Sequence, residues 1–228
     1  MHKLGAITGL RFEARLLAKA AARRGVTALL PPVAVGGSPE RAFEAAICLA
    51  DQGATLLLSF GLGGGLDPAL RPGDVVIAAR VLMPDQPSFA TDPAWTQALA
   101  QALGLQPQAI ITCPRAIVGT AEKETLYQDH GAVLVDMESH GVATAAEARG
   151  LPFACVRAVA DPAGRSIPLA AMAGMAADGG TRPGAVLAAL ARRPGDLPGL
   201  LQVARDSSRA RRALGRVALL HPALFGGR

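Results

Sequence analysis

The chain has 228 residues, half of them apolar, which is enough for a substantial buried core, and we expect one α/β domain. Its formal net charge of +5 comes from the C-terminal end, because residues 192–228 contain eight arginines and two aspartates while the rest is close to neutral. With only 4% aromatic residues and no recognisable nucleic-acid-binding module, this charge does not predict a nucleic-acid partner.

Secreted and membrane-spanning classes are also disfavoured. The apolar stretch at residues 4–10 is followed at once by charged residues, which makes it too short for a signal-peptide core. No uncharged run approaches the roughly 18 residues that a spanning helix needs. Cys48, Cys113 and Cys155 lack paired spacing, so we expect them to be reduced and buried, without a disulfide or zinc site. We therefore expect a cytoplasmic protein.

Apolar runs of strand length alternate with helix-like segments along the chain. This alternation predicts a mostly parallel central sheet with helices on both faces, a three-layer α/β/α arrangement in one domain over residues 1–228. The predicted strands are 4–7, 54–60, 74–79, 109–112, 132–135 and 153–159.

Helix boundaries are marked by a few residues. Ser38 and Pro39 predict the N-cap and first turn of a helix that runs to about residue 49. Gly150 predicts the end of a helix that begins near Glu138, because glycine adopts the left-handed conformation at little cost. Pro183 opens a further helix, and we expect residues 183–228 to form a basic helical extension.

The last predicted helix has two faces. One face carries Arg205, Arg209, Arg212 and Arg216, and the opposite face is apolar. Either the arginines are solvated on a surface helix, or they rest on anionic lipid headgroups as a peripheral membrane contact. The apolar face consists of Leu200, Val203, Ala210, Leu214 and Val217.

Common catalytic motifs are absent from the sequence. In "SFGLGGGLDPALRPGDVVIA" the third glycine of a dinucleotide fingerprint falls on Leu66, and Pro68 and Pro72 prevent the long helix that would bind the pyrophosphate. The chain has no GxxxxGK[ST] loop, no GxSxG elbow and no HExxH pair. We expect neither a cofactor nor a metal site.

Three acids stand where predicted strands give way to loops or helices: Glu13 in "GAITGLRFEA", Glu138 after "AVLVDM" and Asp161 after "FACVRAVA". The carboxyl ends of strands in an open parallel sheet form the ligand crevice, so these acids are expected to converge there. Taken singly, each has a structural alternative, as a helix N-terminal acid or a turn residue.

Three segments together, "LGAITGLRFEARLL", "SFGLGGGLDPALRPGDVVIA" and "VDMESHGVATAAEARGLPFACVRAVADPAG", resemble the purine nucleoside phosphorylase and methylthioadenosine/S-adenosylhomocysteine nucleosidase superfamily. The resemblance runs from about residue 3 to 165 and implies a nucleoside phosphorylase-like fold. Within the superfamily the chain is most similar to the hopanoid-associated branch, which removes adenine from adenosylhopane.

The resemblance implies roles for individual residues. Asp161 matches the general acid that protonates N7 of the departing purine, and Glu138 the group that binds the ribose 2′-hydroxyl. Met137 matches a side chain packed against the sugar, and Glu13 the base that orients water in the hydrolytic members. Asp136 is expected to be a supporting acid. The remaining residues expected to bind the substrate are Gly63, Gly64 and Ile117.

Two co-substrates stay open, with water favoured over phosphate. Phosphorylases of the superfamily place an arginine and a serine in the glycine-rich segment, where this chain has Ser59 and Leu62. Arg11 and Ser38 are the candidates to bind an anion in their place. Hydrolysis is therefore expected, and phosphorolysis of purine nucleosides is the alternative.

The base and 5′ sides of the expected site also depart from the superfamily. Ala116 stands where relatives stack an aromatic residue on the purine, so binding energy is expected from a large apolar 5′ group, such as that of a lipid-linked adenosine. The small residues of 169–180 would leave room for it. Related enzymes are dimers or larger, which implies a homo-oligomer. A binding protein without turnover is the alternative from another class, although such a protein needs no proton donor.

Overall fold

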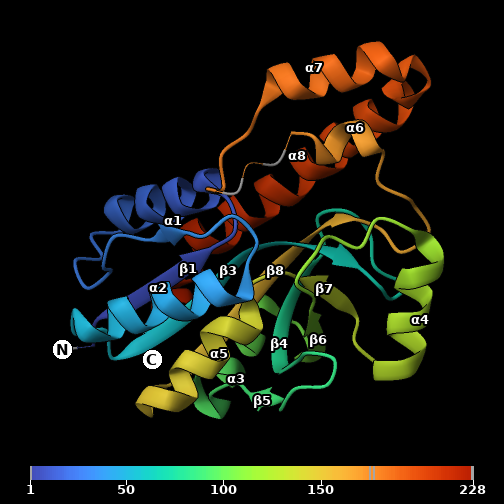
Figure 1. Ribbon diagram of the computed structural model, residues 1–228. Helices are drawn as coiled ribbons and strands as arrows, with labels where there is room; N and C mark the ends of the chain where they lie inside the picture. Colours follow the sequence, from blue (N-terminus) through green and yellow to red (C-terminus); the bar gives the residue numbers. More distant parts are fainter. Residues whose placement is uncertain (1, 175, 177, 227–228) are drawn as a thin grey trace.

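The computed structural model describes residues 2–174, 176 and 178–226, and Figure 1 shows a sheet enclosed by helices. All six predicted strands are present, and two strands of two residues each were not predicted. The strands are β1 Leu4–Thr8, β2 Val33–Ala34, β3 Leu56–Gly65, β4 Val75–Leu82, β5 Phe89–Ala90, β6 Gln108–Thr112, β7 Leu134–Asp136 and β8 Phe153–Asp161. The helices are α1 Arg11–Arg23, α2 Pro39–Asp51, α3 Pro93–Leu103, α4 Thr120–His130, α5 Ser139–Arg149, α6 Leu169–Met172, α7 Pro183–Arg192 and α8 Leu197–Leu220.

The sheet is mixed and partly closed on itself. Its order is β2-β1-β3-β7-β6-β4-β5, and β8 pairs with both β3 and β4. The pairings of β3 with β8, β8 with β4, β4 with β6, β6 with β7 and β7 with β3 therefore form a ring. Five of the eight strand pairings in the described part of the chain are parallel and three are antiparallel. The α/β fold is as expected, with more antiparallel pairing than predicted.

Both faces of the sheet are buried under helices, which is why the strands read as continuous apolar runs. Successive side chains of β3 point to opposite faces. Leu58 and Phe60 pack in the core beneath α1, α3 and α8, whereas Leu57 packs beneath α2 and α5. One cluster lies between the sheet and the helices on each face, so the single domain has three layers.

The predicted helix boundaries are confirmed. The Ser38 hydroxyl accepts a hydrogen bond from the backbone N–H of Arg41, and Pro39 begins α2. Gly150 ends α5 in the left-handed conformation with φ of 60°. Pro183 begins α7. The cysteine prediction is partly wrong: Cys113 and Cys155 are buried, but Cys48 is exposed because α2 turns it away from its core-facing side.

Residues 183–226 divide into two parts with different packing. Helix α7 has no buried residue and stands away from the sheet in Figure 1. The second half of α8 packs on the sheet through Ala210, Leu214 and Val217, while the four predicted arginines of its other face are exposed. Within the described residues, no helix is long and apolar enough to cross a membrane.

Candidate active site

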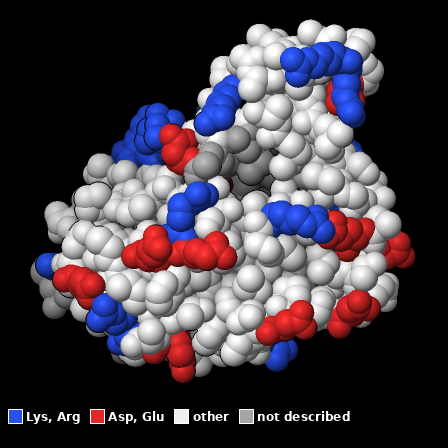
Figure 2. Space-filling model, in the orientation of Figure 1, with Lys and Arg blue, Asp and Glu red and all other residues white. Residues whose placement is uncertain are grey.

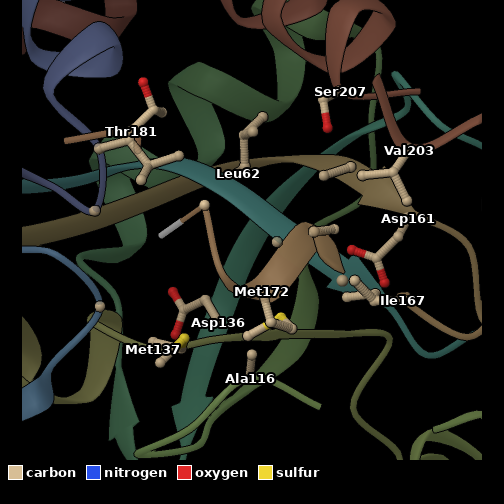
Figure 3. A pocket seen from close by; sticks show the side chains of 18 of the residues that line it. Leu62, Ala116, Asp136, Met137, Asp161, Ile167, Met172, Thr181, Val203 and Ser207 are labelled. Carbon is tan, nitrogen blue, oxygen red and sulfur yellow. The ribbon is translucent and has the colours of Figure 1, made fainter. Parts of the chain in front are cut away.

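One cavity of about 650 Å³ brings the three predicted acids together. Glu13 at the start of α1, Glu138 between β7 and α5, and Asp161 at the end of β8 all line it, as do the other residues expected to bind the substrate: Met137, Gly63, Gly64 and Ile117. Met137 and Asp161 lie on different sides of the cavity in Figure 3. Figure 2 shows a hollow between the α7 region and the body of the molecule. Cavities of this size hold small-molecule ligands.

The glycine-rich segment continues β3 to Gly65 and lets the acids approach its backbone. A Cβ at Gly61 would lie 2.8 Å from Oε2 of Glu13, and a Cβ at Gly64 would lie 3.2 Å from Oδ2 of Asp161. The segment is therefore a strand whose missing side chains make room for carboxylates, which explains why it does not match a phosphate-binding loop.

Glu13 is buried and held by the backbone. Its Oε2 accepts a hydrogen bond from the N–H of Leu10 and its Oε1 from the N–H of Leu62, each at 2.8 Å. Burial raises the pKa of Glu13 to about 7, although these N–H groups favour the charged form. A carboxyl with this pKa is poised to take a proton from water near neutral pH.

Glu138 occupies the N-cap position of α5, but its side chain makes no capping hydrogen bond and lines the cavity instead. Burial, with help from the neighbouring Asp136 and Glu13, raises the pKa of Glu138 to about 8, and Arg157 opposes this rise. The Arg157 Nη2 lies 3.4 Å from Oε2 of Glu138. The carboxyl group of Glu138 thus lies between Arg157 and the cavity.

Arg157 and Asp136 form a buried ion pair behind Glu138. The Arg157 Nε donates to Oδ2 of Asp136 at 2.7 Å, and both side chains are fully buried. Asp136 also accepts from the hydroxyl of Thr112 at 2.6 Å and from Ser139, and the Arg157 Nη2 donates to Ser59 at 2.7 Å. Although Asp136 borders the cavity, its oxygens are used by this network. Asp136 therefore holds Arg157, Thr112 and Ser139 in place.

Asp161 is paired with a buried lysine. The Lys123 Nζ lies 2.5 Å from Oδ2 of Asp161 and also donates to the carbonyl oxygens of Pro162 at 2.9 Å and Arg165 at 3.0 Å. Burial raises the pKa of Asp161 above its ordinary value, and Lys123 opposes that rise. The lysine comes from α4, so this helix and β8 together position the acid.

The two residues expected to bind an anion lie outside this cavity. Arg11 forms an exposed ion pair with Asp178 at 2.6 Å, and Ser38 donates to the carboxylate of Glu40 while capping α2. Ser59 is buried beneath the cavity against Arg157, whereas Leu62 lines it. In the described part of the chain, no three His, Cys, Asp or Glu side chains are placed to hold a metal ion.

Two functional residues were not singled out from the sequence. Arg157 stands inside the apolar run "FACVRAVA", and a charged residue in the middle of a buried strand is a readable signal of a buried partner. Lys123 stands in "TAEKETLYQDH", a charged helix with no such signal. Only the three-dimensional arrangement shows that this lysine is buried against Asp161.

Comparison with known proteins agrees with this fold. A curated relative, a futalosine hydrolase of Streptomyces coelicolor, is 32% identical over 129 residues. The match covers 48% of this chain and 54% of that protein, so it spans about half of the relative's length. The solved futalosine hydrolase of Helicobacter pylori has a TM-score of 0.63 at 15% identity, over 71% of this chain and 88% of that one.

The 5′-methylthioadenosine/S-adenosylhomocysteine nucleosidase of Campylobacter jejuni has a TM-score of 0.63 at 20% identity, over 73% and 88% of the two chains. A Helicobacter pylori nucleosidase of the same name has a TM-score of 0.65 at 13% identity, over 94% and 96%. Residues 20–192 match the Phosphorylase superfamily, which is more than half of the chain. The chain therefore belongs to the Phosphorylase superfamily.

Proposed function

We propose that the protein hydrolyses the N-ribosyl bond of a 5′-substituted adenosine and releases adenine. The observation that carries this proposal is the convergence of Glu13, Glu138 and Asp161 on one cavity from three distant parts of the chain. The names of the relatives, a futalosine hydrolase and methylthioadenosine/S-adenosylhomocysteine nucleosidases, support a nucleosidase. A futalosine-type nucleoside is the second candidate substrate.

The reaction would use each acid differently. Breaking the bond between C1′ and N9 leaves positive charge on the sugar and negative charge on the purine, so the purine needs a proton as it departs. Asp161 would deliver that proton at N7, Glu138 would hold the ribose 2′-hydroxyl, and Glu13 would take a proton from the attacking water. A well-placed acid or base typically contributes about 10² to 10⁴ in rate.

Water fits the site better than phosphate. The buried cations beside the acids, Lys123 and Arg157, are already occupied by carboxylates and carbonyl or hydroxyl groups. Two further arginines line the cavity, but both are exposed, and Arg115 is paired with Glu122. Among the described residues, a phosphate dianion beside the three acids would therefore meet no free buried cation, which is electrostatically unfavourable. Hydrolysis is accordingly the proposed reaction, with phosphorolysis as the alternative.

The proposed substrate carries a large apolar 5′ group, with adenosylhopane as the specific candidate. Apolar side chains from several strands and helices and from the loops between them line the cavity, and Met172, Ile167 and Val203 lie around it in Figure 3. Each buried methylene would contribute about 0.8 kcal/mol. The apolar lining includes Leu10, Leu62, Ile167, Met172, Val186, Leu187, Leu200 and Val203.

The surface beside the cavity supports a peripheral membrane contact. Leu187 of α7 lines the cavity and is 66% exposed. Leu169 of α6 and Leu201 of α8 are exposed as well. Arginines flank these leucines in the sequence, at the end of α7 and along α8. Leucines beside arginines suit the interface of an anionic lipid surface. A homo-oligomer remains a proposal drawn from the resemblance.

The test is product analysis after incubating the protein with adenosylhopane, futalosine or methylthioadenosine, with and without phosphate. We expect free adenine from adenosylhopane at a rate that does not depend on phosphate. Equal kcat/KM values for methylthioadenosine and adenosylhopane would refute the apolar 5′ preference. Binding without base release, identical for wild type and Asp161→Asn, would instead indicate a non-catalytic nucleoside-binding protein.

A further inference from the structure

The pairing of Asp161 with Lys123 is unlike the setting of the other two acids. Glu13 is held by backbone N–H groups and Glu138 lies against an arginine, but Asp161 has a fully buried lysine at 2.5 Å. All three protons of the Lys123 ammonium have acceptors: Oδ2 of Asp161 and two backbone carbonyl oxygens. The lysine is therefore fixed in place and aimed at the carboxylate.

The pairing with Lys123 raises the question of how Asp161 could donate a proton to a purine. An ammonium ion at this distance favours the ionised carboxylate, and an ionised carboxylate has no proton to give to a purine. Lysine can release its proton when it is buried, whereas arginine remains charged. The pair as a whole thus holds one transferable proton, which can sit on Nζ of Lys123 or on Oδ2 of Asp161.

The second oxygen of Asp161 is free to meet the substrate. Hydrogen bonds recorded among the described residues reach only its Oδ2, and the side chain borders the cavity. In Figure 3 the Asp161 carboxylate lies beside Ile167 and Val203 in the cavity wall. One oxygen can therefore face the purine while the other contacts Lys123.

We propose that Lys123 holds the proton that Asp161 passes to the departing purine, so that the lysine is a positioning residue acting through the aspartate. This inference rests on the proposed N-ribosyl hydrolysis. As the bond between C1′ and N9 breaks, its electron pair stays on the purine. The proton on Nζ of Lys123 passes to the carboxylate of Asp161 and from the carboxylate to N7, so that Lys123 becomes neutral and Asp161 is again ionised. The purine leaves neutral.

The remaining steps restore the starting state. Water adds to C1′ and loses its proton to Glu13. A proton then returns through solvent from Glu13 to Lys123, so that both residues regain their original forms and no further reactant is consumed. Lysine is suited to this cycle because its protonated and neutral forms are both accessible in a buried site.

Other charged groups around the pair are themselves paired. Arg165, in the loop after β8, and Asp206, on α8, act on Asp161 in opposite directions. The Arg165 guanidinium forms an ion pair with Asp206, which also contacts Arg209 at 3.1 Å. Lys123 is thus the cation that contacts Asp161 directly. Replacing it should change the charge beside Asp161 and leave the ion pair of Arg165 with Asp206 intact.

The test compares Lys123→Met, Lys123→Arg and the exposed control Lys19→Met. Two probes are used: 5′-methylthioadenosine, whose purine needs a proton, and 4-nitrophenyl riboside, whose leaving group does not. Single-turnover rates are measured from acidic to alkaline pH. Rates with the second probe report whether each variant is folded and still binds ribose.

Lys123→Arg is expected to lose about 10² to 10⁴ in adenine release at all pH values, because arginine keeps Asp161 ionised and supplies no proton. Lys123→Met is expected to retain activity at acidic pH, where Asp161 carries its own proton. The alkaline limit of its activity should move to lower pH, because this variant depends on a proton carried by Asp161 alone. Both variants should keep most of their rate on the nitrophenyl probe.

Three results would overturn the inference. If Lys123→Arg releases adenine as fast as Lys123→Met, with the alkaline limit unchanged in both, the lysine is only a structural cation and the inference alone fails. If the wild-type protein releases no base from methylthioadenosine, adenosylhopane or futalosine, the proposed function fails and takes the inference with it. Equal loss on both probes in both variants likewise contradicts a role in proton transfer.

Discussion

Replacing Arg157 with methionine tests whether the buried ion pair behind the cavity supports both the fold and the site. In the wild type, Arg157 is fully buried and contacts Asp136 at 2.7 Å, Ser59 at 2.7 Å and Glu138 at 3.4 Å. Methionine would leave the Asp136 carboxylate buried without its cation. Breaking a buried pair in this way typically destabilises a protein by about 3 to 5 kcal/mol.

Urea unfolding of Arg157→Met measures that loss, and Arg149→Met is the matched control. Arg149 forms an ion pair with Asp51 at 2.7 Å, but both side chains are well exposed, so its loss should change the free energy of unfolding by about 1 kcal/mol or less. Adding Asp136→Asn to Arg157→Met removes the stranded charge. We expect this double variant to recover part of the lost stability, with a coupling energy of about 1 to 3 kcal/mol.

The same variant changes the chemistry in a predictable direction. Arg157 opposes the burial-driven rise in the pKa of Glu138, so removing it should raise that pKa further above about 8. The KM for a nucleoside with a 2′-hydroxyl should then rise, with little change for its 2′-deoxy analogue. If Arg157→Met unfolds at the same urea concentration as Arg149→Met, the account of the buried network is wrong.

Three further predictions concern the acids and the cavity wall. Asp161→Asn should slow adenine release by about 10² to 10⁴ while sparing 4-nitrophenyl riboside, as measured by initial rates; equal losses on both probes would contradict its role as an acid. The pKa of Glu13 is raised from 4.5 to about 7, so the folded state binds more protons than the unfolded state between these values, and its share of stability should fall as pH rises through this window. Urea unfolding of the wild type should show a steeper fall than Glu13→Gln, which keeps only the share that comes from the raised pKa of Glu138, whereas parallel pH profiles would refute it. Leu187→Asp should raise the KM for adenosylhopane but not for methylthioadenosine, and a common change in both would argue against an apolar 5′ site.

Local signals in the sequence were sufficient for the longer strands and for several helix ends, whereas the three acids were singled out with the help of the family resemblance. Ser38 with Pro39 and Gly150 mark helix ends through their own backbone and side-chain preferences, and the structure confirms both boundaries. The acids Glu138 and Asp161 follow apolar strands, so the edge of the sheet at which they meet follows from the order of the elements. Local chemistry thus accounts for the helix ends, and the order of the elements for the place of the acids.

Features that depend on packing between distant segments were not predictable in the same way. The antiparallel pairing of β3 with β7 depends on Gly64 and Gly65 meeting Val135 and Leu134, and no local pattern specifies that encounter. Lys123 looks like a solvent-exposed helix residue until α4 is placed against the end of β8. Such long-range partners determine which polar residues are buried, and a single sequence carries little trace of them.

The central claim is that the cavity joins water to C1′ of a purine nucleoside and releases the base. The most direct measurement is mass spectrometry of both products after reaction in heavy-oxygen water with phosphate present. The account predicts free adenine and a sugar carrying the heavy oxygen at C1′. A ribosyl 1-phosphate, or a nucleoside recovered intact with every probe, would contradict it.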